Sequence, residues 1–324
     1  MKTFVTGGTG FIGTYVVKRL AGTQHELICL ARETSDRRTL EASGATVVTG
    51  DVTDKDCLLA SMQGCQWVVH LASSFVFWVP NRDVYGTVNV DGTRNVMEAA
   101  LEAGVSKVVH VSTAAAYGSA PWPLTEESPV GAVHFSEYAR TKHEGDLVAW
   151  ELYHKSGLPL VVVYPGAVIG ANDPKAAGRY IRNIAQRRMP AQVLTDVVFP
   201  WVYVGDVAEA IVAALEKEGN IGERYLLTGE NLSFGEVNGI IGEIAGVPLP
   251  RLRLPDFVTF VSAYILTMLS RFTKKPPILD MCVDQIRLMK HGGLVDGSKA
   301  ERELGMVYTP IRDALREAIT SLPE

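Results

Sequence analysis

Hydrophobic residues in the first half of the chain follow two alternating patterns. Short unbroken apolar runs, such as Glu26–Ala31 and Val108–Ser112, predict strands that are buried on both faces. Longer stretches with apolar residues three and four positions apart, such as Phe11–Leu20, predict amphipathic helices. Because the two alternate, we expect an α/β fold with a doubly wound parallel sheet. Further strands are expected at Thr3–Thr6, Thr46–Thr49, Trp67–Leu71 and Pro159–Val163, and further helices at Arg37–Ser43, Lys55–Met62, Val90–Ala103 and Ala139–Ser156.

The alternation weakens after about Gly170. Turn-forming residues gather in Asn172–Pro174 and Pro248–Pro255. An amphipathic helix is expected over Asp206–Lys217, and one more strand over Tyr225–Thr228. The last part of the chain is predicted to be mostly helical, with a closing helix at 311–321. This change of pattern predicts a second, smaller domain built from late segments.

Composition excludes several classes of protein. Of the 324 residues, 47% are hydrophobic and 21% charged, which is a globular balance rather than a disordered one. The net charge of −5 argues against a nucleic-acid partner. The four cysteines form no CxxC pair and the seven histidines show no ligand spacing, so we expect neither a disulfide framework nor a metal site.

The termini and apolar runs bear on location. The first strand leads directly into glycines, which is unlike a signal peptide. No apolar run reaches the length of a membrane-spanning helix, so we expect a cytoplasmic protein. The nearest run is Phe257–Leu269, followed by the basic residues Arg271, Lys274 and Lys275. Two hypotheses stay open for the segment 257–275: a lid that lines the substrate pocket, or a peripheral contact with a membrane surface.

A glycine-rich turn joins the first predicted strand to the first helix. In the segment Thr6-Gly-Gly-Thr-Gly-Phe-Ile-Gly13, Gly7 permits a tight turn and Gly10 lets the backbone approach a diphosphate. Gly13 allows the helix to pack closely on the strand. The start of the helix, at Phe11 and Ile12, then offers free N–H groups to the phosphates. This context predicts a dinucleotide site.

Charged residues after the next two strands refine that site. An acid after the second strand would favour NAD, but the chain has Arg32 there, with Arg37 close by. Since a guanidinium suits a 2′-phosphate, we expect NADP(H) in preference to NAD(H), unless Arg32 is only a surface charge. Asp51 and Val52 end the third strand and are placed to meet the adenine. The alternative for Asp51 is a helix cap, which Thr53 or Asp54 would fill better. Leu71, Ala72 and Ser73 occupy the equivalent place after the fourth strand.

A tyrosine and a lysine four residues apart form the candidate acid–base pair. On a helix, Tyr138 and Lys142 share one face. The ammonium is expected to lower the phenol's pKa towards the working pH. Upstream, Ser112 and Thr113 end a strand, where a hydroxyl can donate to a substrate carbonyl. Each piece alone is also compatible with an ordinary surface pair or turn.

Together these pieces resemble the extended short-chain dehydrogenase/reductases, the NAD-dependent epimerase/dehydratase family. The resemblance runs over nearly the whole chain. It is carried by Gly7 to Gly13, Gly50-Asp-Val52, His70-Leu-Ala72, Asn89-Val-Asp-Gly-Thr93, Ser112-Thr113, Tyr138 with Lys142, Pro165-Gly-Ala-Val-Ile-Gly170, Val202-Tyr-Val-Gly-Asp-Val-Ala208 and Lys299-Ala-Glu-Arg-Glu-Leu-Gly305.

The resemblance implies a Rossmann domain for the cofactor and a smaller, mostly helical C-terminal domain for the substrate. We expect residues 1–170 with about 200–230 in the first, and about 171–199 with 231–324 in the second. It implies Tyr138 as the acid–base group, Lys142 as its partner and Thr113 as the catalytic hydroxyl, with Ser112 assisting. The backbone at Pro165, Gly166 and Val168 would hold the nicotinamide amide. A homodimer through helices near 90–103 and 139–156 is also implied.

Departures from the family pattern bear on the substrate. Sugar-nucleotide enzymes of the family carry an Arg that grips a diphosphate where this chain has Phe199-Pro200. Ala114 and Ala115 replace the Asp-Glu pair of the dehydratases. The residues Phe75, Phe77, Trp78, Phe199 and Trp201 predict an aromatic, apolar substrate pocket, or else a core beneath the loop.

We therefore expect an NADPH-dependent reductase of a largely apolar ketone or aldehyde, similar to the dihydroflavonol-4-reductase group. The stretches Glu223–Asn231 and Lys299–Gly305 also resemble hopanoid-associated sugar epimerases. Three alternatives stay open: a nucleotide-sugar epimerase, a 3β-hydroxysteroid dehydrogenase/isomerase-like enzyme, and a non-catalytic NADP sensor.

Overall fold

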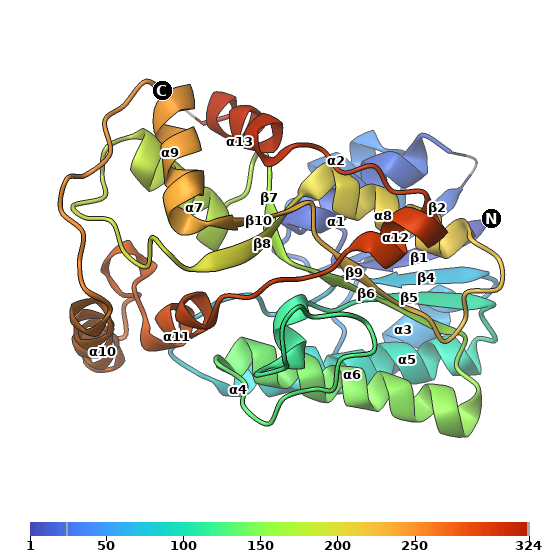
Figure 1. The fold of residues 1–324 in the computed structure, drawn as a ribbon. Helices are drawn as coiled ribbons and strands as arrows, with labels where there is room; N and C mark the ends of the chain where they lie inside the picture. The colour runs from blue at the N-terminus through green and yellow to red at the C-terminus, as the bar shows by residue number, and fades with distance from the viewer. Residues whose placement is uncertain (24, 323–324) are drawn as a thin grey trace.

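The protein is described by a computed structural model, which covers residues 1–23 and 25–322. Its centre is a seven-stranded parallel sheet in the order β3-β2-β1-β4-β5-β6-β9 (Figure 1). The order reverses between β1 and β4, and in open α/β sheets a ligand crevice lies at that switch point. The strands are β1 Lys2–Thr6, β2 Glu26–Ala31, β3 Thr46–Thr49, β4 Trp67–His70, β5 Lys107–Val111, β6 Leu160–Pro165 and β9 Arg224–Leu227.

Helices cover both faces of this sheet. On one face, α1 (Phe11–Ala21) packs against α8 (Val204–Glu216), beside α2 (Arg38–Ala42). On the other, α3 (Lys55–Met62), α5 (Gly92–Glu102) and α6 (Glu137–Ser156) pack side by side. Each strand contributes to two buried apolar clusters, one per face. This double burial explains why the strands are unbroken apolar runs.

A second, three-stranded sheet lies beside the first in the order β10-β8-β7. It is made of β7 (Ala167–Ile169), β8 (Val198–Tyr203) and β10 (Glu230–Ser233). Three helices pack around it: α7 Ala176–Ala185, α9 Phe234–Ala245 and α13 Ile311–Thr320. Their apolar side chains form a third cluster. The sequence patterns did not predict this sheet, because its strands are short and β8 is interrupted by a proline.

The remaining elements follow the second sheet. Helices α10 (Asp256–Thr273) and α11 (Val283–His291) pack on each other, and α12 (Ser298–Leu304) returns to the first sheet beside α8 and β9. Short turns of helix complete the fold at α4 Asp83–Gly86, η1 Thr87–Asp91, η2 Ala114–Tyr117 and η3 Ile278–Asp280. Within the described residues, no helix has the length and apolar character needed to cross a bilayer.

The predicted α/β class, with a doubly wound parallel sheet and a largely helical C-terminal region, is confirmed. Strand and helix boundaries in the first half agree to within a few residues. The largest difference is upstream of α5, where the chain already turns helically through α4 and η1. Helix α6 begins at Glu137, so Tyr138 lies in its first turn.

Candidate active site

The glycine turn after β1 brings three pieces of backbone unusually close. Gly7 has φ +72°, and a β-carbon there would lie 2.5 Å from the backbone nitrogen of Ala72. A β-carbon on Gly13 would lie 2.1 Å from the carbonyl oxygen of Gly7. Helix α1 starts at this turn without a side-chain cap, so its first N–H groups stay available for a ligand. A diphosphate fits such a cradle.

A cavity of about 680 Å³ opens over the carboxyl ends of the strands of the first sheet. Nearly all the residues expected to hold the cofactor line it: Gly7, Gly10, Phe11, Ile12, Gly13, Arg32, Asp51, Val52, Leu71, Ala72, Ser73, Tyr138, Lys142, Pro165, Gly166 and Val168. Segments that are far apart in the sequence therefore meet in one place.

Arg37 is the exception. It lies outside the cavity lining, and its guanidinium donates to the carbonyl oxygen of Arg32 at 3.1 Å. Arg37 thus contacts the backbone that carries Arg32. The carboxylate of Asp51 accepts from the backbone N–H and the hydroxyl of Thr53, both at 3.0 Å. Asp54, rather than Asp51, caps α3 by accepting from the N–H of Cys57.

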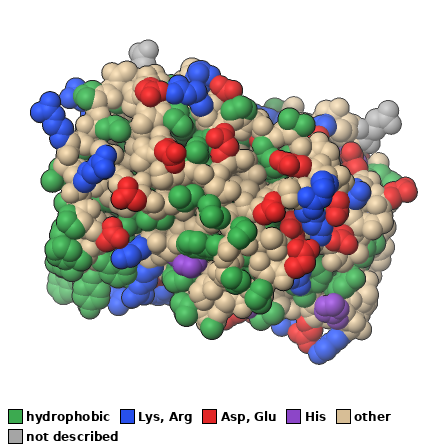
Figure 2. Space-filling model, viewed as in Figure 1, with side chains coloured by type: hydrophobic (Ala, Val, Ile, Leu, Met, Phe, Trp, Pro, Cys, Tyr) green, Lys and Arg blue, Asp and Glu red, His purple; other side chains and the backbone are tan. Residues whose placement is uncertain are grey.

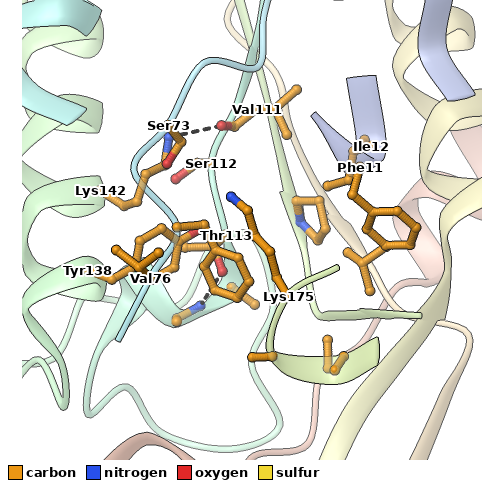
Figure 3. Close-up of a pocket in the computed structure, with 18 of the residues that line it drawn as sticks. Phe11, Ile12, Ser73, Val76, Val111, Ser112, Thr113, Tyr138, Lys142 and Lys175 are labelled. Carbon is orange, nitrogen blue, oxygen red and sulfur yellow. Dashed lines mark hydrogen bonds between the residues drawn. The ribbon is translucent and has the colours of Figure 1, made fainter. Parts of the chain in front are cut away.

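Helix α6 carries the candidate acid–base pair into the cavity. Its first turn is capped by Ser136, and Tyr138 is buried there beside the side chains of Thr113 and Ser73, which hydrogen-bond its hydroxyl. One turn later, the Lys142 ammonium donates to the carbonyl oxygen of Val111 at 2.9 Å (Figure 3). The predicted residues therefore converge from three elements.

The expected lowering of the tyrosine's pKa is wrong for this structure. Burial raises the pKa of Tyr138, and the hydrogen bonds from Thr113 and Ser73 only partly oppose that effect. The physical cause is desolvation. The rings of Phe75 and Phe77 stand edge-on to the phenol, with centroid distances of 4.9 and 6.5 Å. Burial also lowers the pKa of Lys142 to about 8.

Sequence analysis missed a buried carboxylate beneath this pair. Asp146 accepts from the hydroxyl of Ser112 at 2.7 Å and lies 3.1 Å from Nε2 of His110. Burial raises the pKa of Asp146 to about 6, while the charge of Lys142 acts to lower it. In turn, Asp146 acts to raise the pKa of Lys142. Its position four residues after Lys142 is the signal that could have found it.

The predicted aromatic residues are placed differently from one another. Phe75, Phe77, Phe199 and Trp201 line the cavity, but Trp78 does not. Trp201 belongs equally to the core of the second sheet, because it is 3% exposed and its ring nitrogen donates to the carbonyl oxygen of Leu232. Both expectations for these residues, pocket lining and core packing, therefore describe Trp201.

Several lining residues were not foreseen. His291 lies between Trp122 and Phe135, with ring centroids 4.9 and 4.0 Å away. Lys175 extends into the space between Tyr138 and Ile12 (Figure 3), 5.6 Å from the ring centroid of Phe75. No sequence signal marks these residues. The hypothesis that the segment 257–275 lines the pocket is wrong, since no described residue of α10 is part of the lining.

Over residues 1–23 and 25–322, no three His, Cys, Asp or Glu side chains come together in a way that could hold a metal ion.

Comparison with known proteins identifies the family. The pattern of the NAD dependent epimerase/dehydratase family matches residues 3–227, well over half of the chain. The chain belongs to this family. Family members bind a nicotinamide cofactor, and this enzyme is accordingly an NAD(P)-dependent oxidoreductase.

Relatives within the epimerase/dehydratase family cover almost the full chain. This chain is 32% identical to sterol demethylase protein B of Methylococcus capsulatus, over 98% of this chain and 97% of that one. It is 30% identical to a candidate dihydroflavonol 4-reductase of Synechocystis, over 98% and 93%. The crystal structure of gox2253 superposes with a TM-score of 0.85 at 34% identity, covering 98% of this chain and 97% of that one.

Proposed function

We propose that this enzyme is an NADPH-dependent reductase of a largely apolar ketone or aldehyde, and reversibly an alcohol dehydrogenase. One observation carries the proposal. The phenol of Tyr138 faces the cavity with Thr113 at its side and two phenylalanine rings against it. The resemblance to a candidate dihydroflavonol 4-reductase supports it as well.

The proposed cofactor fits the cavity. The backbone packs so tightly at Gly7 and Gly13 that neither position has room for a β-carbon, and this turn sets the uncapped start of α1 at the cavity, where a diphosphate would bind. Arg32 lines the cavity at the end of β2, where a guanidinium would pair with a 2′-phosphate. When bound, the nicotinamide supplies a hydride to a carbonyl carbon. Pro165, Gly166 and Val168 lie at the cavity wall where its amide would be held.

The proposed mechanism uses groups already in contact. Tyr138 donates its proton to the carbonyl oxygen as that oxygen becomes an alkoxide. Thr113 donates a hydrogen bond to the same oxygen, which stabilises the developing charge. Because burial keeps the pKa of Tyr138 high, the residue is protonated at neutral pH and serves as an acid. Lys142 brings a positive charge into the same cavity one turn further along α6, and Ser112 connects the site to Asp146.

The apolar character of the substrate is inferred from the outer lining. Phe75 and Phe77 come from the loop after β4, and Phe199 comes from β8. Trp122 and Phe135 complete this wall. Aromatic walls favour an apolar body, while the polar groups near Tyr138 recognise one oxygen.

A nucleotide-sugar epimerase is the second candidate, and one observation favours it. Lys175 places an ammonium inside the cavity, where it would attract a substrate phosphate. Burial lowers the pKa of Lys175, and the charge of Arg32 acts in the same direction. The hydroxysteroid dehydrogenase/isomerase hypothesis is supported by similarity to a 3β-hydroxysteroid-dehydrogenase/decarboxylase of Arabidopsis thaliana, which is 25% identical over 98% of this chain and 78% of that one. The sensor hypothesis has no comparable support.

We also propose that residues 1–170 with about 200–230 hold the cofactor, and that about 171–199 with 231–324 shape the substrate pocket. Pairing of two copies through α5 and α6 stays a prediction.

Turnover of two substrate panels tests the proposal. NADPH absorbance should fall with apolar ketones, including flavanone-like and ketosteroid compounds. UDP- and dTDP-sugars should be unchanged. Tyr138→Phe should lower kcat by about 10²–10⁴-fold because the proton donor is lost, while NADPH still binds. Tyr180→Phe, which removes another phenolic hydroxyl from the lining, should stay within a few-fold of the wild type. Conversion of nucleotide sugars without net NADPH loss would contradict the reductase.

Cofactor preference tests the role of Arg32. Arg32→Asp should raise the KM for NADPH by roughly tenfold or more and favour NADH, because a phosphate partner is replaced by a repelling charge. Arg38→Asp is the matched control, since Arg38 is an exposed arginine outside the lining that pairs with Asp36. An unchanged preference in Arg32→Asp would rule out the NADP assignment.

The pH dependence of kcat/KM for NADPH tests the coupling of Lys142 with Asp146. Lys142 is charged below its pKa of about 8, so the wild-type value should fall as the pH rises through about 8. Asp146→Asn removes a charge that raises this pKa, so the fall should move to lower pH. Ser112→Ala removes the hydrogen bond that Asp146 accepts but keeps the carboxylate, and should lower the rate without that displacement. If kcat/KM of Asp146→Asn falls at the same pH as in the wild type, Asp146 does not control the pKa of Lys142.

A further inference from the structure

Helix α10 turns its large apolar side chains towards solvent. Phe257 is 70% exposed and Phe272 is 89% exposed, and five others between them are also exposed. These residues recur three, four or seven positions apart, which places them on one side of the helix. We call this set the α10 apolar face: Phe257, Val261, Tyr264, Ile265, Met268, Leu269 and Phe272.

The opposite side of α10 holds the helix in place with smaller residues. Thr259, Ala263 and Ser270 are buried, and the hydroxyl of Thr267 accepts from the backbone N–H of Val283 at 3.0 Å. Ala263 packs in an apolar cluster with residues of α11. Docking of the helix therefore does not require the α10 apolar face. An exposed apolar patch of this size usually marks an interaction surface.

Basic residues gather at the C-terminal end of this face. Residues 251–279 contain five basic residues and one acidic residue, in a chain whose net charge is −5. The acidic residue, Asp256, pairs with Lys290 of α11 at 3.4 Å. Arg271 and Lys274 are exposed beside the apolar side chains, as is Lys275. Figure 2 shows hydrophobic side chains gathered over α10, with basic side chains next to them.

We propose that the α10 apolar face seats this enzyme on the surface of a bilayer that contains anionic lipids. An interfacial helix of this kind lies parallel to the surface, with its apolar side chains among the acyl chains and its cations at the phosphates. This mode requires no membrane-spanning helix. A second copy of the chain is a poorer occupant, because the same excess of positive charge would face itself.

Helix α10 lies close to the cavity, so binding of its apolar face to a bilayer would bring the membrane near the active site. Helix α11 lies between α10 and the cavity: Val283 and Ile286 face α10, whereas Leu288, Met289 and His291 line the cavity. A bilayer at the α10 apolar face would therefore lie one helix away from the site. The proposal itself does not depend on which reaction the site performs.

Co-sedimentation of the full chain with lipid vesicles tests this surface. The wild type should bind vesicles of phosphatidylcholine and phosphatidylglycerol (3:1), bind pure phosphatidylcholine more weakly, and lose affinity as salt is added. Ile265→Ser/Phe272→Ser should weaken binding by roughly tenfold or more, since two apolar side chains that would insert among the acyl chains are lost. Lys274→Glu/Lys275→Glu should weaken binding to the anionic vesicles selectively, also by roughly tenfold.

Val307→Ser/Ile221→Ser is the matched control, because both positions are exposed apolar residues far from α10 in the sequence. It should bind as the wild type does. Circular dichroism of every variant would show whether each is folded. The proposal is overturned if the wild type does not bind anionic vesicles, or if folded Ile265→Ser/Phe272→Ser binds equally well. It is also overturned if sedimentation velocity shows that the face joins two copies in place of lipid.

Discussion

Helix α6 is fixed against the end of strand β5 by polar contacts that water does not reach. Lys142 donates to the carbonyl oxygen of Val111, and Asp146 accepts from Ser112 and faces His110. A buried polar group that loses its partner costs on the order of 1–3 kcal/mol, so a slide of the helix along the strand would break several contacts at once. The position of Tyr138 relative to Thr113 depends on these contacts between α6 and the end of β5.

The cavity has two kinds of surface around Tyr138, one polar and one aromatic. The glycine cradle and the strand ends supply backbone and short polar groups. The loop after β4 and the segments from the second half of the chain supply aromatic rings. Those rings remove water from the phenol of Tyr138 and raise its pKa, which suits a residue that gives up a proton only when an alkoxide forms. Packing of aromatic rings against Tyr138 therefore sets the acidity of its hydroxyl.

The sequence patterns predicted those features that depend on residues close together in the chain. The buried strands, the glycine turn and the Tyr138–Lys142 face each depend on residues close in sequence, and each was found. The short strands of the second sheet were not, since their stability comes from packing against α7, α9 and α13. Trp122 meets His291 across more than half the chain, and Lys175 reaches the cavity from the position just before α7. No periodicity records such tertiary contacts, whereas the position of Asp146 one helical turn after Lys142 is a local signal.

The fate of the transferred hydrogen tests the central claim most directly. The full-length enzyme would turn over an apolar ketone with NADPH deuterated at the transferring position of the nicotinamide, and the product would be analysed by mass spectrometry. The proposed reductase predicts one deuterium at the carbinol carbon for each NADPH oxidised. Deuterium retained by the cofactor, with nucleotide sugar interconverted and no net oxidation, would contradict it.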